Sequence, residues 1–198
     1  MTGRTQAALT EAPEWMSAEM PPAYQTRLWE IQRMSAELHA MDRIGRVLWE
    51  TGGPLRDAVG AVFSALKCEV DAAPGSDGPI VVKLGDSRRL LLVVSGATNP
   101  IQKSDEELAR VFRAVQFAAG DDRVVYVANN DPATPPADRP DPVLPDALGV
   151  LHKIGADVVT TATLFRLWRL SYEDQQKARK ILDHLHAQDG GLFIIPSR

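Results

Sequence analysis

The segment "RVVYVANN", residues 123–130, constrains the fold most, because it is a continuous apolar run of strand length. A strand that is apolar on both faces is expected to be covered on both faces, as in sheets that lie between layers of helices. Earlier in the chain, "PIVVKL" and "RRLLLVVSG" are β-rich runs on either side of the turn "GDS" and predict an antiparallel hairpin. We therefore expect an α/β fold with a mixed central sheet.

Helices are predicted before and after these strands. Two glycines end a first long helix, and a second helix is expected to begin near Pro54. The segment "SDEELARVFRAVQFAAG" predicts a helix with Ser104 as its N-cap, and "TTATLFRLWRL" predicts another that is capped near Thr161 or Thr163. A last helix is expected to start at Ser171. A proline-rich loop, residues 131–146, separates the central strand from the later helices.

The N-terminal part predicts a tail and a long amphipathic helix. We expect a flexible tail over 1–22, the helix over 23–50 and an α/β domain over 51–198. Apolar residues recur on the helix at steps of three and four, followed by a gap of seven: Leu28, Ile31, Met34, Leu38, Met41 and Leu48. This spacing stays near 3.5 residues over about three heptads, so the stripe could pair with a second copy or lie along its own domain.

Composition limits the classes of function. The chain has 198 residues, 44% hydrophobic and 24% charged, which suits one compact domain with an extension. A net charge of -4 gives no overall attraction to nucleic acid. The single cysteine, Cys68, excludes an internal disulfide and fits buried packing in a reducing compartment. Without an apolar run of membrane-span length or a signal-peptide core, we expect a cytoplasmic protein with no membrane partner.

Four segments in order carry a resemblance: "TGGPLRDAVGAVFSALKCEV", "PIVVKLGDSRRLLLVVSG", "VVYVANNDPATPPADRP" and "TTATLFRL". Together, from about Leu48 to Leu170, they resemble the restriction-endonuclease-like fold of the PD-(D/E)xK superfamily, and in particular bacterial nuclease-like domains of unassigned function. The resemblance implies a three-layer core with a mixed central sheet, here preceded by the long helix.

The superfamily's chemistry needs an acid at the start of the first hairpin strand, and an acid and a lysine on the second. The resemblance places these positions at Pro79, Val93 and Ser95. No ligand set for a divalent metal survives there, because Mg²⁺ needs several well-placed oxygen atoms. We expect no catalytic residue, no metal and no cofactor. Nearby carboxylates that could rebuild a site are Asp77, Asp86 and Glu106.

Other candidate residues have weaker patterns. Ser95 lacks a nucleophile elbow and a histidine nearby in sequence. His184 and His186 are two positions apart on a predicted helix, so they point to different faces, and we expect them to be solvated rather than to bind a metal. No phosphate-binding glycine motif is present.

Two functions follow from these patterns. The first is a non-catalytic interaction or scaffold protein that forms a homodimer or docks a protein partner through the helix residues Leu28, Ile31, Met34, Leu38 and Met41. The alternative is a metal-dependent nuclease or DNA-binding protein with a migrated active site. Nucleic acid could then contact the basic residues Lys83, Arg88, Arg89 and Lys103, although a solvated strand edge explains them as well.

Overall fold

A computed structural model describes residues 15–71, 78–85 and 87–195. The chain divides into two compact units, residues 1–42 and residues 43–198. The second unit holds the sheet and both hydrophobic cores.

The described residues of the second unit form one sheet with the strands in sequence order. Strand β2 is antiparallel to β1 and β3, whereas β3, β4, β5 and β6 run parallel to one another. The sheet is therefore mixed, as predicted. The strands are β1 (Glu69–Asp71), β2 (Ile80–Lys83), β3 (Arg89–Ser95), β4 (Asp122–Ala128), β5 (Ala156–Thr160) and β6 (Gly191–Leu192).

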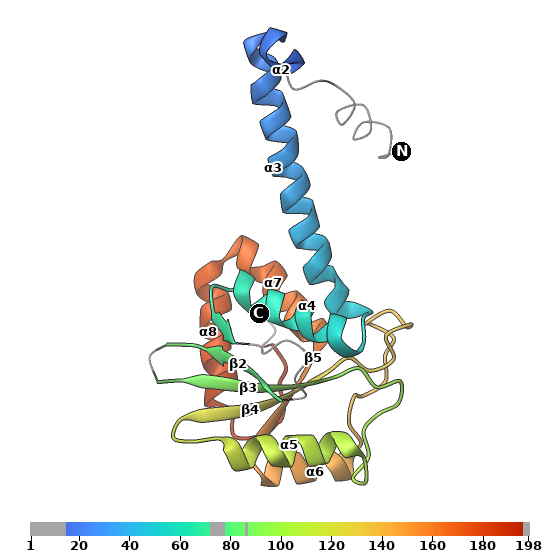
Figure 1. Ribbon diagram of the computed structural model, residues 1–198. Helices are drawn as coiled ribbons and strands as arrows, with labels where there is room; N and C mark the ends of the chain where they lie inside the picture. Colours follow the sequence, from blue (N-terminus) through green and yellow to red (C-terminus); the bar gives the residue numbers. More distant parts are fainter. Residues whose placement is uncertain (1–14, 72–77, 86, 196–198) are drawn as a thin grey trace. The chain divides into compact units, whose positions relative to one another are not determined.

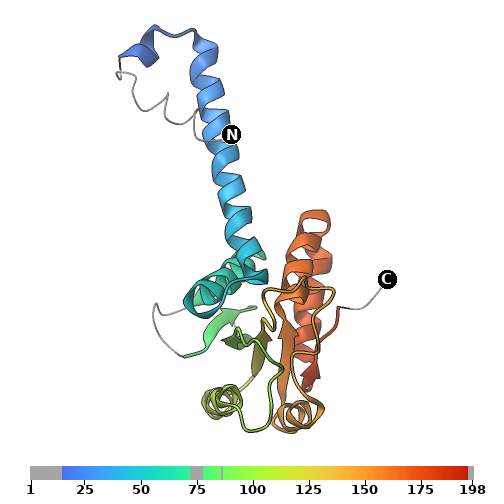
Figure 2. The ribbon, with the colours of Figure 1, turned by 90° about the vertical axis from the view of Figure 1, so that its right-hand side faces the viewer.

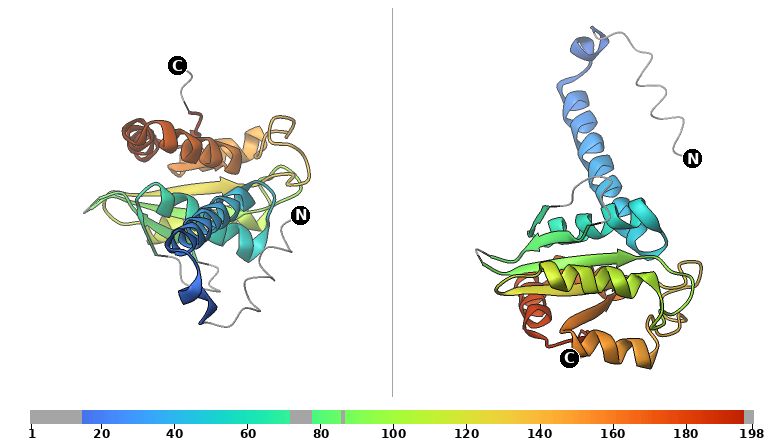
Figure 3. Two further views of the ribbon diagram at one scale, coloured as in Figure 1. Left: turned by 90° about the horizontal axis from the view of Figure 1, so that it is seen from above. Right: turned by 60° about the horizontal axis from the view of Figure 1, so that its bottom comes forward.

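Helices cover both faces of this sheet. On one face lie α4 (Gly52–Ala65), α7 (Thr161–Glu173) and α8 (Gln175–Ala187), and on the other lie α5 (Glu106–Phe117) and α6 (Pro145–Lys153). Figures 1 and 2 show α5 and α6 side by side below the sheet. Helix α5 comes forward in the right-hand view of Figure 3. The domain is thus an α/β sandwich of three layers, with a core on each side of the sheet.

Alternating side chains of β3 and β4 supply both cores, which explains why their sequences are apolar at successive positions. On β3, Leu90 and Leu92 face α4, α7 and α8, while Leu91 and Val93 face α5 and α6. On β4, Val125 likewise faces α4, α7 and α8, while Tyr126 faces α5 and α6. The prediction that residues 123–130 hold a central strand covered on both faces is confirmed.

Two predicted helix starts, those of α5 and α8, are corrected, and the start of α7 near Thr161 is confirmed to within one residue. The N-cap of α5 is Asp105 rather than Ser104, and its carboxylate accepts a hydrogen bond from the Gln102 amide at 2.8 Å. The N-cap of α7 is Thr160, whose hydroxyl accepts a hydrogen bond from the Thr163 amide. Helix α8 is capped by Asp174, which accepts a hydrogen bond from the Lys177 amide.

Ser171, the predicted start of α8, lies inside α7 instead. In both α7 and α8, the backbone amide of the third residue after the cap donates to the side chain of the cap. This is the usual way in which a capping side chain satisfies a free amide of the first turn. Several neighbouring residues in these segments can act as caps, so sequence alone did not select the right one.

The first unit contains α2 (Met16–Glu19) and most of α3 (Pro22–Gly45). The predicted long helix is confirmed, but it ends at Gly45 and continues as the short 3-10 helix η1 (Arg46–Leu48). Gly52 then adopts a φ of +57°, a conformation that favours glycine. Ile44 and Val47 are buried in the core of the second unit. Among the described residues, no helix combines the length and apolar character needed to cross a membrane.

Candidate functional site

The three positions that the resemblance assigns to catalysis lie on the hairpin face beneath α5. Ile80 pairs with Leu92, so continuing the antiparallel register by one residue sets Pro79 opposite Val93. Val93 and Ser95 are 4% and 8% exposed. Val93 packs in the core shared by α5 and α6. The register therefore sets Pro79 opposite Val93, and the three positions carry a pyrrolidine ring, an isopropyl group and a hydroxyl.

Ser95 is the polar member of this face, and its surroundings satisfy it. Its hydroxyl donates to Glu107 Oε1 at 3.3 Å. On the same helix, Arg110 donates to the Val94 carbonyl at 3.4 Å. Burial raises the pKa of the Tyr126 hydroxyl far above its ordinary value, and a hydrogen bond with Ser95 opposes this shift only in part. The space lined by Ile101, Glu107, Leu108, Val111, Tyr126 and Leu151 is too small for a water molecule.

The carboxylates around the hairpin do not form a metal site in the part of the chain that is described. Glu107 contacts Ser95, whereas Glu106, which the sequence singled out, is exposed. Residues one apart on a helix differ by about 100° in direction, which explains why the neighbouring glutamate lies at the hairpin. Within residues 15–71, 78–85 and 87–195, no three His, Cys, Asp or Glu side chains gather closely enough to hold a metal ion. Asp77 and Asp86 lie outside the described residues.

The predicted basic residues do not share one location. Lys83 and Arg89 are paired neighbours at the amino end of β3. Lys103 follows the carboxyl end of β3, and a seven-residue strand is about 20 Å long. Three of the four also have acidic partners: Lys83 with Glu69 at 2.5 Å, Arg88 with Asp183 at 2.9 Å, and Arg89 with Asp122 at 2.6 Å.

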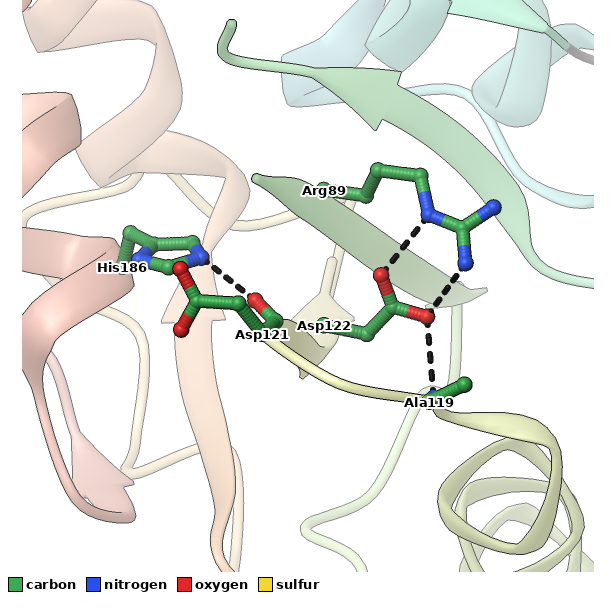
Figure 4. Close-up of polar contacts among 5 residues, drawn as sticks. All are labelled: Arg89, Ala119, Asp121, Asp122 and His186. Carbon is green, nitrogen blue, oxygen red and sulfur yellow. Dashed lines mark hydrogen bonds and ion pairs between the residues drawn. The ribbon is translucent and has the colours of Figure 1, made fainter. Parts of the chain in front are cut away.

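Arg89 and Asp122 form the best-organised ion pair at this edge of the sheet (Figure 4). They face each other in the parallel register of β3 and β4, and two N–H groups of the guanidinium donate to the two carboxylate oxygens at 2.7 and 2.6 Å. The Ala119 amide donates a third bond at 3.0 Å. The hydrogen bonds from Arg89 lower the pKa of Asp122 more than burial raises it. This pair fastens the amino ends of two central strands.

His186 lies close by and corrects one expectation. Its side chain is buried, at 5% exposure, and Nε2 donates to the Asp121 carbonyl at 2.8 Å, as Figure 4 shows. His184 is exposed on the same helix, as predicted. The expectation that both histidines are solvated is therefore wrong for His186, because it faces the sheet from α8 and bonds to the start of β4.

A second polar network lies at the carboxyl ends of β4 and β5. The Asn129 amide donates to the Glu50 carbonyl at 2.8 Å, and its oxygen accepts bonds from Arg139 at 2.7 Å and from Thr161 at 2.8 Å. Arg139 also donates to the carbonyls of Thr134 and Leu48. Burial lowers the pKa of Arg139, and the charge of Asp131 opposes that shift. All three nitrogens of the guanidinium bond to protein, so the network holds the proline-rich loop in place.

The apolar stripe of α3 has few neighbours within its own unit. In the described part of that unit, residues 15–42, only the four-residue helix α2 accompanies α3. Leu28 is partly exposed. The exposed fractions of the other side chains in the stripe are large: Ile31 55%, Met34 58%, Leu38 60% and Met41 38%. Trp29 beside them is 63% exposed.

Sequence reasoning missed the contact of Glu107 with Ser95, the ion pair of Asp122 and the Asn129 network. The signal for Asp122 was an acid at the first position of a buried strand, which favours an ionic partner on the neighbouring strand. No family model, no curated protein and no solved structure matches the chain.

Proposed function

We propose that this chain is a non-catalytic interaction protein, in which a nuclease-like α/β domain carries a helix that contacts a second copy or another protein. The observation that carries the proposal is the packing of Val93 and Ser95 under α5, at the positions where the resemblance requires a metal-binding acid and a lysine. Val93 and Ser95 are buried, so they offer neither oxygen ligands nor open space to a hydrated Mg²⁺ ion.

The order of elements also supports the nuclease-like part of the proposal. Helix α4, the strands β1 to β3, helix α5 and strand β4 follow one another as the resemblance implies, and α6, β5 and α7 come after the proline-rich loop. Fold likeness carries little functional weight by itself, so the function rests on the residues of the hairpin face.

Helix α3 is the proposed contact element. Ile31, Met34, Leu38 and Met41 follow one another at steps of three, four and three, which is the spacing of a coiled-coil seam. The ion pairs Arg27–Glu30 and Arg33–Glu37 lie within the helix and balance its charge. A seam of this kind gains stability when a second helix removes its apolar side chains from water, at about 25 cal/mol per Å².

Mass in solution by light scattering tests this element. We expect the full chain to be a dimer at micromolar concentration and Leu38→Glu to be a monomer, because a buried unpaired carboxylate opposes pairing. Ala36→Glu is the matched control, since it adds the same charge on the opposite side of the helix and should leave the dimer intact. Point variants are preferable to removal of the helix, because Ile44 and Val47 belong to the domain core. A monomeric wild-type chain would rule out self-association and leave a different protein as the partner.

A further inference from the structure

Asp157 is a buried carboxylate that none of the features above involves. It is the second residue of β5 and is 0% exposed. Its Oδ1 accepts a hydrogen bond from the Gly190 amide at 3.1 Å. Its other oxygen, Oδ2, is buried and has no donor at hydrogen-bond distance among the described residues, and the Gln188 side chain compensates its burial only in part. A buried carboxylate oxygen without a partner is costly when the group is ionised, because it has lost its water.

The segment that covers Asp157 is short and pairs with the edge of β5. Residues 188–193 connect α8 to β6 and include the two residues of β6, which pair in parallel with Asp157 and Val158. The Phe193 amide donates to the Val158 carbonyl at 2.8 Å, and the Phe193 ring is buried in the core. We call residues 188–193 the C-terminal latch.

Gly190 fixes the geometry of the latch. Its φ of +81° favours glycine, and a Cβ atom there would lie 2.9 Å from the His152 carbonyl oxygen. A residue with a side chain would therefore not fit at the position whose amide donates to Asp157. A change in the charge of the Asp157 carboxylate would therefore act on the latch through the hydrogen bond from the Gly190 amide.

The charged groups around Asp157 only partly compensate for its burial. Arg123 of β4 is a cation that acts on Asp157, but its Nε has no hydrogen-bond partner among the described residues, and its NH1 lies 3.9 Å from the exposed Asp189. His186 of α8 bonds to the Asp121 carbonyl, and His152 of α6 lies against Gly190. Burial raises the pKa of Asp157 to about 7, while Gly190, Gln188 and Arg123 oppose the rise and Asp189 adds to it.

We infer that the C-terminal latch is a pH-sensitive device, closed over β5 while Asp157 is protonated and opened when Asp157 ionises and takes up water. The sign follows from linkage. A carboxyl group whose pKa is higher in the closed state than in the open state stabilises closure fully below its open-state pKa of about 4, and loses that contribution as the pH rises to about 7. Opening would uncover the edge of β5 and the Phe193 ring.

Hydrogen exchange of the full chain tests the inference. The readout is the protection factor of the Gly190 and Phe193 amides, which corrects for the direct effect of pH on exchange, with Val127 of β4 as the internal reference. With pKa values near 4 when open and about 7 when closed, protection of the latch amides should fall about tenfold between pH 6 and pH 8 relative to Val127. In Asp157→Asn it should be independent of pH over this range.

Asp189→Asn is the matched control. It removes an exposed carboxylate from the same segment and should keep the tenfold fall. The inference is overturned if the wild-type protection factors do not change between pH 6 and pH 8. It is equally overturned if Asp157→Asn keeps the wild-type slope, which would assign the change to His152 or His186. Should Asp157→Asn fail to fold, Asp157→Ser takes its place, because it also lacks a carboxyl group.

Discussion

Asp122 and Asp157 are both buried carboxylates near the amino ends of neighbouring parallel strands, yet their environments shift their pKa values in opposite directions. Asp122 receives two hydrogen bonds from Arg89 and one from the Ala119 amide, and its pKa is lowered. Asp157 receives one bond from the Gly190 amide, with the Gln188 side chain as a further compensating group, and its pKa is raised to about 7. Burial is common to both, so the presence of a bonded guanidinium decides whether a buried aspartate stabilises this fold at neutral pH.

The largest loss of stability is expected when Asp122 is neutralised. Asp122→Asn removes the negative charge to which Arg89 donates two hydrogen bonds and leaves an amide group facing the guanidinium. We expect the free energy of unfolding to fall by about 2 kcal/mol at pH 7, measured by urea titration.

The pH dependence of this loss has a definite sign. The folded-state pKa of Asp122 lies below its unfolded value, so its contribution is present above about pH 4 and is lost as the pH falls through the folded-state pKa. The difference between wild type and Asp122→Asn should therefore shrink in acid. An equal difference at pH 3 and pH 7 would contradict the assignment of the stabilisation to the ion pair.

Asp157→Asn should have the opposite effect. Because the folded-state pKa of Asp157 is raised to about 7, the wild-type chain loses stability as the pH rises from about 4 to about 7. The variant lacks this loss and should be more stable than wild type by roughly 1–3 kcal/mol at pH 8, with little difference at pH 4. Thermal unfolding of both proteins at these two pH values measures the effect. A variant that is less stable than wild type at pH 8 would show that the ionised carboxylate is adequately compensated.

Arg89→Lys should have the smallest effect of the three. Lysine keeps the positive charge but cannot present two parallel N–H donors to the carboxylate. The loss in urea midpoint should be less than half of that for Asp122→Asn, since Arg89 is itself 43% exposed. A loss as large as that of Asp122→Asn would mean that the paired geometry, rather than the charge, holds the strands together.

The sequence predicted the strands well and their side-chain partners poorly. The continuous apolar runs of β3 and β4 predicted central strands, because such runs are stable only when covered on both faces. The pairing of Arg89 with Asp122 depends on the register of two strands that are 33 residues apart, which periodicity does not give. The choice between Glu106 and Glu107 depends on the rotation of α5, and a shift of one residue changes which carboxylate reaches Ser95.

At the candidate site, too, the sequence predicted some features and not others. The positions of Pro79, Val93 and Ser95 followed from the resemblance, and the hairpin register sets Pro79 opposite Val93. The tight packing of the hairpin face under α5 could not be predicted, because it depends on side chains from α5, α6 and β4 together. A lone carboxylate in the apolar segment "GADVV" indicated that Asp157 is buried. Its partner, Gly190, lies 33 residues further along the chain and could not be predicted from this segment.

The central claim is that the hairpin face has no catalytic chemistry. Incubation of the full chain with plasmid and with single-stranded DNA, in Mg²⁺ and separately in Mn²⁺, tests it most directly, with Glu107→Gln as the variant that removes the carboxylate at Ser95. The account predicts no cleavage above the protein-free control with either metal. Metal-dependent cleavage that Glu107→Gln abolishes would contradict it and would make this face an active site.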